Sequence, residues 1–437
     1  MNWTENLKNK INDNSAIIGI VGLGYVGLPL ATAFSKKFKV VGYNKSDGKT
    51  EQLKCGVSYI EDVKDEEINL DKLYPTTDYQ DLKECDFIII TVPTPLREDK
   101  SPDLSYVKRA GEEVGDILRN GQYVILKSTT YPGTTEEFLI PVLEEKSGLT
   151  AVKDFGVGYS PERVDPGNQE FRIENTPNIV GGVTPELTEI CALLFEGITG
   201  EVIQVKDCKT AEAVKMIENI YRNVNIALAN ELALIFEKMD IDIWEAIGAA
   251  KTKPFGFTPF YPGPGVGGHC IPLDPYYLSY RAKHFGIIPR FIETAGEIND
   301  FMPIHTVNLV RKGLKKIDKN IRGSKILILG ISYKANISDT RESPAVNVIE
   351  ELVENGADIK VYDPCAQSIT TRFGEFNSKG SLKQNISPAD CVVILADHDE
   401  FMGNQEILKA LEDSVVVVDT KNVLDLKESD EKFYVKL

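Results

Sequence analysis

The chain has 437 residues, 42% of them apolar and 26% charged, which is the composition of a globular protein long enough for two or three domains. Its formal net charge of −17, without any basic run, argues against binding to nucleic acid or to an anionic membrane surface. Seven cysteines occur without a CxxC pair, which argues against a disulfide framework or structural zinc site and favours the reducing cytoplasm. No apolar run is long enough to span a membrane. We therefore predict a cytoplasmic protein without a metal site, nucleic-acid partner or membrane insertion.

A phosphate-binding motif stands near the N-terminus. Residues 16–21 are a short apolar, β-branched run that predicts a buried strand, and an apolar helical stretch begins at Leu28. The spacing between them is GxGxxG, which marks a dinucleotide-binding turn when a strand precedes it and a helix follows it. The first glycine makes the turn, the second admits a pyrophosphate, and the third lets the helix pack on the strand. The expected cofactor contacts here are Gly22, Gly24, Tyr25, Val26 and Gly27.

The end of the second predicted strand, residues 39–44, bears on the choice of cofactor. This position usually carries an acid that binds the adenosine ribose, but here it is Asn44, followed by Lys45. Asn44 can hydrogen-bond a ribose hydroxyl and does not repel a 2′-phosphate, and Lys45 is either a solvated side chain or a phosphate ligand. NAD is the predicted cofactor, and NADP stays open as an alternative.

Further buried strands of the same sheet are predicted at residues 85–95, 123–130, 155–160 and 178–182. In doubly wound sheets the ligand lies beyond the carboxyl ends of the strands, which makes Thr94 and Thr129 candidate site residues. The alternative for Thr129 is a turn-capping role. The charged loop 161–167 is bounded by prolines and is expected to face the substrate, with Glu162 and Arg163 as its candidate ligands.

Helical periodicity dominates the middle of the chain. Apolar residues recur at helical spacing over residues 210–238 with no Pro or Gly between them, and a second helix is expected near residues 244–250. Lys215 and Asn219 lie four residues apart and so share one face of the long helix. They are either a solvated pair or donors to a developing oxyanion. A long helix between two α/β units is also a natural surface for a homodimer.

A second α/β unit follows. Its strands are predicted at residues 325–330, 359–363, 391–396 and 415–419, and its first helix at residues 345–355. The polar loop 333–344 carries the cations Lys334 and Arg341 and is expected to face a ligand. The predicted fold is α/β, with two Rossmann-like doubly wound domains joined by a long central helix. The expected boundaries are 1–208 for an NAD-binding domain, 209–318 for a central dimerisation domain that carries the Cys270 loop, and 319–437 for a second Rossmann-like domain that binds something other than a dinucleotide.

Residues 263–277 form a loop of glycines and prolines that can be neither a regular helix nor a central strand. It holds His269, Cys270 and, four residues after the thiol, Asp274. Cys270 is either a small buried hydrophobe or a nucleophile with Asp274 available to handle a proton or place a water. His269 is expected to be structural or to contact substrate, because neighbouring side chains in an extended loop point apart.

Seven ordered motifs between Ile17 and Asp419 resemble the UDP-glucose/GDP-mannose dehydrogenase family. The His-Cys pair, the Asp-Pro-Tyr-Tyr tail and SPERVDPGN look most like the branch that oxidises UDP-N-acetylhexosamines, with the N-acetylglucosamine enzymes of bacterial surface-polysaccharide synthesis as the preferred match. The motifs are GLGYVGLPLA, TVPTP, KSTT, SPERVDPGN, K-x-x-x-N, GPGVGGHCIPLDPYYL and GISYK with DTRESP.

The resemblance implies a four-electron oxidation of the sugar C6 alcohol to a carboxylate. Cys270 would form a thiohemiacetal and then a thioester, and water placed near Asp274 would release the product. Lys215 would stabilise the oxyanion, with Asn219 and Thr129 supporting it or the water. Glu162 would act as a base or as an organiser of water.

The resemblance also implies ligand contacts, and it implies that residues 319–437 are a UDP-binding domain. Arg341 is expected to contact cofactor phosphates, and three aromatic residues before the glycines are expected to shape the sugar and uridine pocket or to be ordinary packing residues. The expected substrate contacts are Glu162, Arg163, Lys215, Asn219, Phe257, Phe260, Tyr261, Gly267 and Lys334.

Three alternatives remain open at this point. The first is a UDP-glucose or UDP-N-acetylmannosamine 6-dehydrogenase, which has the same chemistry and a different pocket. The second is an inactive homologue that binds nucleotide sugars. The third is an ordinary single-hydride dehydrogenase in which Cys270 is merely buried and no thioester forms.

Overall fold

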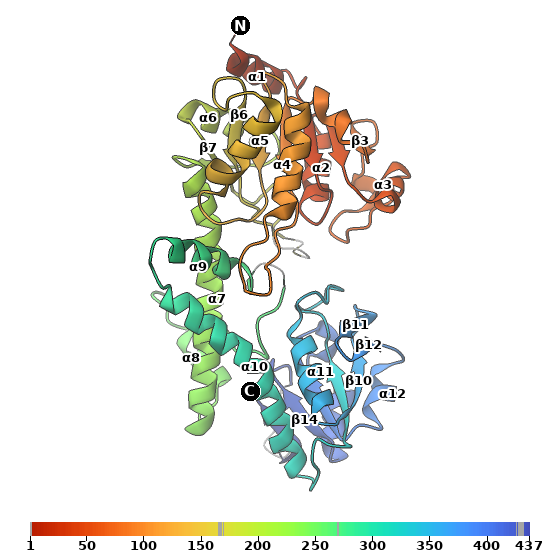
Figure 1. Ribbon diagram of the computed structural model, residues 1–437. Helices are drawn as coiled ribbons and strands as arrows, with labels where there is room; N and C mark the ends of the chain where they lie inside the picture. The colour runs from red at the N-terminus through yellow and green to blue at the C-terminus, as the bar shows by residue number, and fades with distance from the viewer. Residues whose placement is uncertain (1, 165–167, 169, 269–270, 425, 427–431) are drawn as a thin grey trace. The chain divides into compact units, whose positions relative to one another are not determined.

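The computed structural model describes residues 2–164, 168, 170–268, 271–424, 426 and 432–437. These residues form two compact units, one of Met1–Glu218 with Tyr276–Ile287 and one of Asn219–Pro275 with Ile288–Leu437. Each unit has its own mostly parallel sheet, so the predicted fold class is confirmed (Figure 1). The finer division into three domains stays a prediction.

The first unit contains an eight-stranded sheet of order β3-β2-β1-β4-β5-β6-β7-β8, parallel except between β6 and β7. The strands predicted from the apolar runs are all present, and the short strands β3 and β8 were missed. The strands are β1 Ile17–Val21, β2 Lys39–Tyr43, β3 Leu73–Thr76, β4 Phe87–Ile90, β5 Tyr123–Leu126, β6 Gly156–Tyr159, β7 Asn178–Gly182 and β8 Val202–Gln204.

Both faces of this sheet are buried, as its apolar strands require. In β4, Phe87 and Ile89 belong to one hydrophobic cluster with α1, α2 and α6, while Ile88 and Ile90 belong to another with α4 and α5. Successive side chains of a strand point to opposite faces, so this alternation shows that helices cover the sheet on both sides. The helices are α1 Trp3–Asn12, α2 Gly27–Ser35, α3 Asp47–Lys54, α4 Ser105–Ile117, α5 Ile140–Ser147 and α6 Pro185–Phe195.

The long predicted helix is confirmed as α7, Cys208–Lys238, and the helix after it as α8, Ile243–Ala250 (Figure 1). Two more helices were missed, α9, Asp274–His284, and α10, Arg290–Lys315. α10 contains Pro303, whose ring and missing N–H disfavour a helix interior, so local sequence alone argues against a helix there.

The second unit contains a five-stranded parallel sheet of order β10-β9-β13-β14-β15. Ile326 and Ile328 of β9 face one cluster and Leu327 and Leu329 the other, so this sheet is also covered on both faces. Figure 1 shows α10 and α11 side by side against it. The elements are β9 Lys325–Leu329, α11 Pro344–Glu354, β10 Asp358–Tyr362, the hairpin β11 Ser368–Thr371 and β12 Gly374–Asn377, α12 Leu382–Ile386, β13 Cys391–Ile394, α13 Gln405–Glu412, β14 Val416–Asp419 and β15 Tyr434–Lys436.

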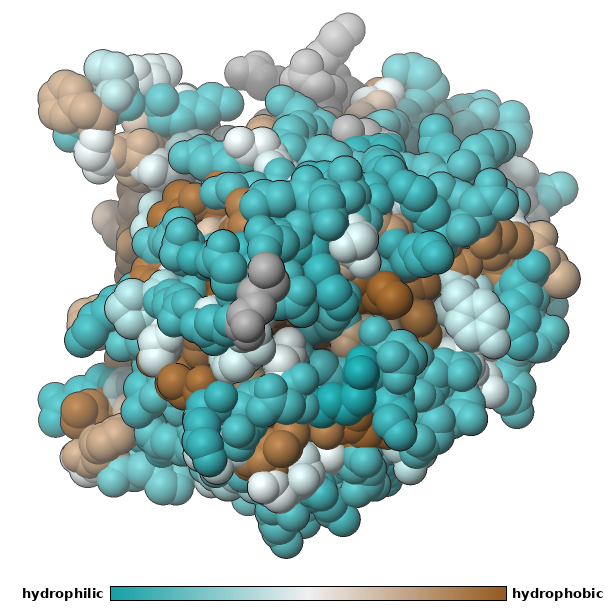
Figure 2. Space-filling model, turned by 90° about the horizontal axis from the view of Figure 1, so that it is seen from above, coloured by the Kyte–Doolittle hydropathy of each residue, from teal (hydrophilic) through white to brown (hydrophobic). Residues whose placement is uncertain are grey.

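The surface matches the acidic, polar composition. The face seen in Figure 2 is mostly hydrophilic, with separate brown patches of apolar side chains. Among the described residues no helix is both long and apolar enough to cross a membrane.

Candidate active site

The GxGxxG turn has the geometry that its spacing predicts. Gly22 adopts a left-handed φ of +96°, and its N–H donates to the carbonyl of Tyr43 at 2.8 Å. A Cβ on Gly27 would lie 1.8 Å from the Gly22 carbonyl oxygen and 2.6 Å from Thr91 Oγ1, so no other residue fits there. A Cβ on Gly24 would meet no described atom within 4 Å. The space over Gly24 therefore suits the close approach of a ligand rather than the packing of the protein.

The N-terminus of α2 lies directly behind this turn. Its N-cap residue, Val26, offers no capping side chain. The Leu28 N–H donates to the Gly24 carbonyl at 3.0 Å and Pro29 has no N–H, so the amides at the N-terminal end of the helix are those of residues 24–27. These amides and the positive end of the helix dipole suit a pyrophosphate. Tyr25 is 42% exposed beside them. The residues present thus fit the nicotinamide dinucleotide that the motif implies.

A carboxylate that the sequence did not indicate lies at the end of β2. Glu113 of α4 pairs with the Lys45 ammonium at 2.5 Å and accepts a hydrogen bond from the Tyr43 hydroxyl at 3.3 Å. Burial and the charge of Glu113 raise the pKa of Tyr43 to about 12. Asn44 donates from Nδ2 to the Tyr59 hydroxyl at 3.3 Å. Lys45 is therefore a paired cation, a third arrangement besides the two considered from sequence.

The ends of β4 and β5 are joined through Thr94. Its hydroxyl donates to the Thr129 carbonyl at 2.8 Å, and its own carbonyl accepts a hydrogen bond from the Tyr277 hydroxyl. The Thr94 side chain is 4% exposed, while Thr129 is half-buried. Thr94 thus fixes the backbone that presents Thr129.

Two buried ammonium groups meet the segment after β6. Lys215 of α7 donates to the Glu162 carbonyl at 2.7 Å, and Lys127, only 3% exposed, lies 3.3 Å from Glu162 Oε2. Glu162 Oε1 accepts the N–H groups of Arg163 and Val164 at 2.8 and 2.7 Å. Predicted residues Glu162 and Lys215 are thus brought together, whereas Lys127 was missed because its partner is distant in sequence.

The Arg163 guanidinium already has partners within the protein. Its guanidinium pairs with Glu218 at 2.7 Å and donates to the Pro177 carbonyl at 2.6 Å. A small cavity beside it is lined by Lys127 and Glu162 among others. Its volume of about 20 Å³ is enough for roughly one water molecule.

Asparagines on one face of α7 hold the glycine-rich loop of the second unit. Asn219 Nδ2 donates to Asp274 Oδ2 at 2.5 Å, and Asn223 Nδ2 donates to the Ile271 carbonyl at 3.1 Å. Asn219 and Asp274 are 4% and 2% exposed. Asp274 is the first residue of α9, where the helix dipole favours a carboxylate. Residues immediately after position 270 are thereby fixed, although Cys270 and His269 themselves lie outside the described residues.

The same loop packs on the β9–α11 connection. A Cβ on Gly267 would lie 2.7 Å from both Tyr333 Cβ and Pro344 Cδ, and one on Gly268 would lie 2.9 Å from the Tyr333 ring. Gly268 also has a left-handed φ of +86°. Predicted substrate contact Gly267 is therefore required by packing of this loop, whatever else it contacts.

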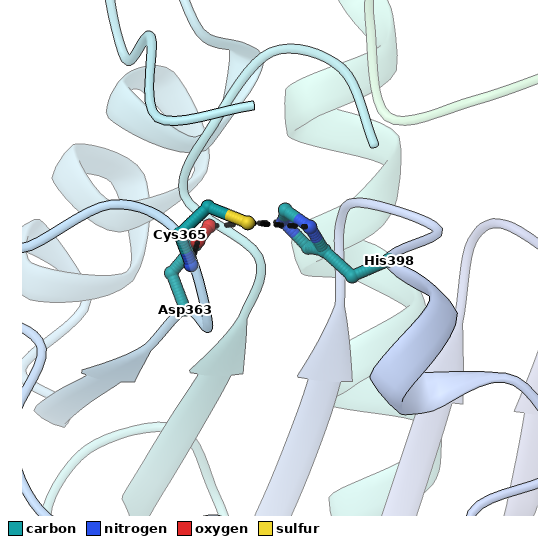
Figure 3. Close-up of side chains that lie close together, drawn as sticks. All are labelled: Asp363, Cys365 and His398. Carbon is teal, nitrogen blue, oxygen red and sulfur yellow. Dashed lines mark hydrogen bonds and ion pairs between the residues drawn. The ribbon is translucent and has the colours of Figure 1, made fainter. Parts of the chain in front are cut away.

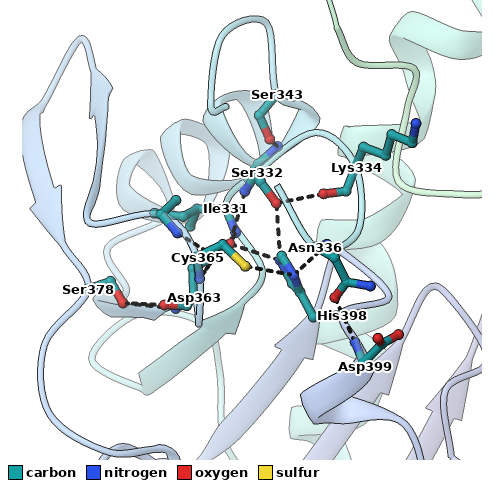
Figure 4. Close-up of polar contacts among 12 residues, drawn as sticks. Ile331, Ser332, Lys334, Asn336, Ser343, Asp363, Cys365, Ser378, His398 and Asp399 are labelled. Atoms are coloured by element: carbon teal, nitrogen blue, oxygen red, sulfur yellow. Dashed lines mark hydrogen bonds and ion pairs between the residues drawn. The ribbon is translucent and has the colours of Figure 1, made fainter. Parts of the chain in front are cut away.

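The cations of this connection differ in their surroundings. Arg341 makes a two-point ion pair with Asp339, at 2.9 and 2.6 Å, and stays 53% exposed. Lys334 is half-buried, and its side chain points away from the polar cluster drawn in Figure 4. Its carbonyl accepts a hydrogen bond from the Ser332 hydroxyl at 2.9 Å.

The three predicted aromatic contacts are exposed or packed on other rings. Phe257 is 42% exposed. Phe260 packs edge-on against Tyr221 of α7, and Tyr261 stacks on Trp244 of α8 with centroids 5.6 Å apart in both pairs. The packing interpretation thus has direct contacts for Phe260 and Tyr261.

Asp363, Cys365 and His398 are a group whose donor atoms could face a metal ion (Figure 3). The carboxylate is already saturated: Oδ2 accepts the N–H groups of Ile331 and Ser332, and Oδ1 accepts two further backbone N–H groups, from residues 365 and 366. These four N–H groups, with their hydrogens directed at both oxygens, leave no open position for a cation, so the donor set does not fit a metal site.

Comparisons with protein families identify the family of the chain. Family models match residues 16–199 as the NAD binding domain, 209–301 as the central domain and 327–426 as the UDP binding domain of one family. The chain belongs to the UDP-glucose/GDP-mannose dehydrogenase family. The resemblance found in the motifs is thereby confirmed, and the chain is an enzyme of an NAD-dependent oxidoreductase family.

Relatives with different sugar names are similarly close. A UDP-N-acetyl-D-glucosamine 6-dehydrogenase of Pseudomonas aeruginosa is 40% identical over 417 residues, which cover 94% of this chain and 98% of that protein. A UDP-N-acetyl-D-mannosamine dehydrogenase of Methanocaldococcus jannaschii is 36% identical, with 93% and 92% covered. The structure of the UDP-D-ManNAc dehydrogenase of Pyrococcus horikoshii superposes with a TM-score of 0.88 at 34% identity, covering 96% of this chain and 98% of that one. These relatives establish that the chain belongs to the nucleotide-sugar 6-dehydrogenase class, but their names differ in the sugar.

The two glycines Gly24 and Gly27 should respond differently to alanine. Gly24→Ala is expected to keep the thermal midpoint of the wild type and to weaken NAD⁺ binding at least about tenfold, because the new methyl group occupies only the ligand's space. Gly27→Ala is expected to lose about 1–3 kcal/mol of unfolding free energy, because its Cβ collides with the Gly22 carbonyl. Calorimetric titration and thermal unfolding check both. Equal NAD⁺ affinity in Gly24→Ala and wild type would contradict the assignment of this turn.

Proposed function

We propose that this enzyme oxidises the C6 alcohol of UDP-N-acetylglucosamine, or a related UDP-N-acetylhexosamine, to the uronate through a covalent Cys270 intermediate. The observation that carries the proposal is the 2.5 Å hydrogen bond between buried Asn219 and Asp274. It supports a carboxylate of fixed orientation four residues after the thiol. Asn223, which binds the carbonyl of Ile271, supports a fixed backbone next to the thiol.

The proposed chemistry balances as two successive hydride losses. The C6 alcohol gives up a hydride and a proton and becomes an aldehyde. The Cys270 thiol adds to the aldehyde carbon, a C–S bond forms, and the oxygen takes a proton. A second hydride and proton leave to give the thioester, and water then attacks it, so that the C–S bond breaks and the thiol is restored. When bound, NAD⁺ supplies the hydride acceptor for each oxidation, so two are consumed for each sugar.

The chain's own residues supply charge and orientation in this scheme. Lys215, one helical turn before Asn219 on α7, is proposed to stabilise the oxyanion formed at each step. Asp274 is proposed to hold or move the proton of the attacking water, with Thr129 as a further hydroxyl donor. Glu162 is proposed to organise water rather than to act as a free base, since its carboxylate already accepts two backbone N–H groups and faces Lys127.

The remaining ligand contacts follow the family's division of labour. We propose residues 1–208 as the NAD-binding domain, 209–318 as the central domain and 319–437 as the UDP-binding domain, with Lys334 as a contact of the substrate. The half-buried position of Lys334 supports this role, whereas the Arg341–Asp339 pair gives Arg341 a competing partner. A nucleophilic thiol needs a reducing compartment, which supports a cytoplasmic location.

Counting NADH tests the proposal directly. With limiting UDP-N-acetylglucosamine and excess NAD⁺, two NADH are expected for each sugar consumed, with a uronate as product. Cys270→Ser should bind UDP-N-acetylglucosamine with nearly unchanged affinity and form no carboxylate. One NADH for each sugar would indicate the single-hydride alternative. If UDP-N-acetylglucosamine does not react but UDP-glucose or UDP-N-acetylmannosamine gives two NADH for each sugar, that sugar becomes the assigned substrate. Binding of these sugars without oxidation of any of them would favour an inactive homologue.

For the cofactor we propose NAD rather than NADP. Glu113 neutralises Lys45 at 2.5 Å, so a 2′-phosphate beside Asn44 would gain no unpaired cation there. The carboxylate thus compensates for the acid that is absent from the end of β2.

Glu113→Gln is therefore expected to raise the ratio of kcat/KM for NADP⁺ to that for NAD⁺ about fivefold, the worth of roughly 1 kcal/mol for a half-exposed pair. Glu112→Gln is the matched control, since Glu112 lies next to it on α4 and faces Lys108 at 3.9 Å instead. Asn44→Asp should lower the ratio. An unchanged ratio in Glu113→Gln would contradict the assignment.

We also propose that α7 forms a homodimer. Tyr221, Leu228 and Ile235 recur on this helix at a seven-residue spacing and are 52%, 51% and 46% exposed. A repeat of large apolar side chains along one stripe is typical of a helix that packs against another helix. A second copy of the chain could cover this stripe with its own α7, so no other protein is needed.

Leu228→Glu is expected to convert a dimer into a monomer in light scattering after size exclusion, because it places a charge in the apolar stripe. Leu70→Glu, at a 45% exposed apolar residue outside α7, is the control and should leave the mass unchanged. A dimer that survives Leu228→Glu together with Ile235→Glu would place the interface elsewhere.

A further inference from the structure

We propose that His398 is a positioning residue, which fixes the 331–336 turn and through it the glycine loop that precedes Cys270. The inference rests on the proposed function for its effect on the substrate, but the coupling of the two loops can be measured without activity. His398 lies after β13 and is completely buried. None of the sequence motifs pointed to it.

Asp363, the residue after β10, binds the start of this turn. Its Oδ2 accepts the N–H groups of Ile331 at 2.7 Å and Ser332 at 3.1 Å (Figure 4). The same oxygen lies 3.1 Å from His398 Nε2. Although burial raises the pKa of Asp363, hydrogen bonds from His398 and from backbone N–H groups lower it to about 2. Asp363 is therefore a stable anion that binds the start of the turn.

The hydrogen-bond partners of His398 determine which of its ring nitrogens carries the hydrogen. Nδ1 accepts the backbone N–H of Asn336 at 3.0 Å, so Nδ1 carries no hydrogen and the imidazole is neutral. Nε2 must then carry the hydrogen, which it shares between Asp363 Oδ2 at 3.1 Å and Ser332 Oγ at 3.0 Å. Ser332 can accept because its own hydroxyl hydrogen goes to the Lys334 carbonyl at 2.9 Å. One imidazole thus binds both ends of the turn.

Two residues of the turn, Tyr333 and Lys334, connect it to the proposed active site. Tyr333 is its second residue after Ile331, and Gly267 and Gly268 approach the Tyr333 side chain so closely that a Cβ on them would lie 2.7 and 2.9 Å away. Gly268 is two residues before Cys270. Lys334, the proposed substrate contact, belongs to the same turn, and its side chain points away from His398 (Figure 4). A displaced turn would therefore move both the glycine loop and the Lys334 ammonium.

Two other interpretations of this cluster fail on geometry. In a Ser-His-Asp triad, serine and aspartate bind opposite nitrogens of the imidazole, whereas here both face Nε2. A metal ion would need the lone pair of Nδ1, which takes the Asn336 N–H, and a free position on Asp363, whose two oxygens already accept four backbone N–H groups. Positioning is the function that uses the contacts of His398 with Asp363, Ser332 and Asn336.

Hydrogen exchange measured by mass spectrometry tests the coupling. In His398→Ala, exchange is expected to become at least about threefold faster both in residues 331–336 and in residues 263–268, which His398 does not touch. His398→Asn should restore part of the protection, because its amide oxygen can replace Nδ1 as acceptor for Asn336. Ser378→Ala is the matched control: Ser378 binds the Asp363 backbone at 2.9 and 3.1 Å but not the turn. Faster exchange in 331–336 alone would overturn the proposed link.

Kinetics separate positioning from general loss of structure. In His398→Ala the KM for the UDP-sugar is expected to rise about tenfold, while the Kd for NAD⁺, which binds the first unit, stays at the wild-type value. An equal weakening of both ligands would indicate a merely structural role and overturn the inference. Ser332→Ala, which removes the hydroxyl that links the His398 imidazole to the Lys334 carbonyl, should give a smaller change in the same direction and serves if His398→Ala fails to fold. If wild type oxidises no UDP-sugar, the proposed function fails, and the exchange data still decide the coupling.

Discussion

The hydrogen bonds from α7 asparagines to the glycine-rich loop are the constraint on which the proposed active site depends. A loop of glycines and prolines has no ladder of its own, yet its buried polar groups must find partners. Asn230 Oδ1 accepts the Gly263 N–H at 2.9 Å, Asn223 binds the Ile271 carbonyl, and Asn219 binds Asp274. α7 therefore provides a template for an irregular loop, and its register fixes Gly263, Ile271 and Asp274.

Features that depend on local sequence could be predicted, and pairings over long distances could not. The glycines of the dinucleotide turn were identified because steric limits on φ and close approach act within a few residues. Lys127, Glu113 and His398 were missed because each takes its meaning from a partner elsewhere in the chain. A signal for the α7 contacts did exist: asparagines at 219, 223 and 230 fall on one face of the helix, and buried amides without partners would be costly.

The same distinction explains the secondary structure. Strongly apolar, β-branched strands such as β4 and β9 are buried on both faces and were found, whereas β15, a three-residue strand, is defined only by its partner β14. α10 was missed because Pro303 lowers helix propensity locally, while tertiary burial of residues such as Met302 and Val310 outweighs that cost. Tertiary packing, which a single sequence does not display, decides such cases.

An acidic protein that binds an anionic nucleotide sugar and an anionic cofactor must rely on local donors. At physiological ionic strength charges more than about 8 Å apart are largely screened. The repulsion of an anionic ligand by the net charge of −17 is therefore weaker than its attraction to donors within the site. Many of the chain's own carboxylates near the proposed sites are already committed: Glu113 to Lys45, Glu162 to Lys127 and backbone N–H groups, and Asp363 to four backbone N–H groups. Because these anions are satisfied internally, none of the three is a free carboxylate that would compete with phosphate or a developing oxyanion for the α2 N-terminus or for Lys215 and Lys334, the ammonium groups that we propose as ligands.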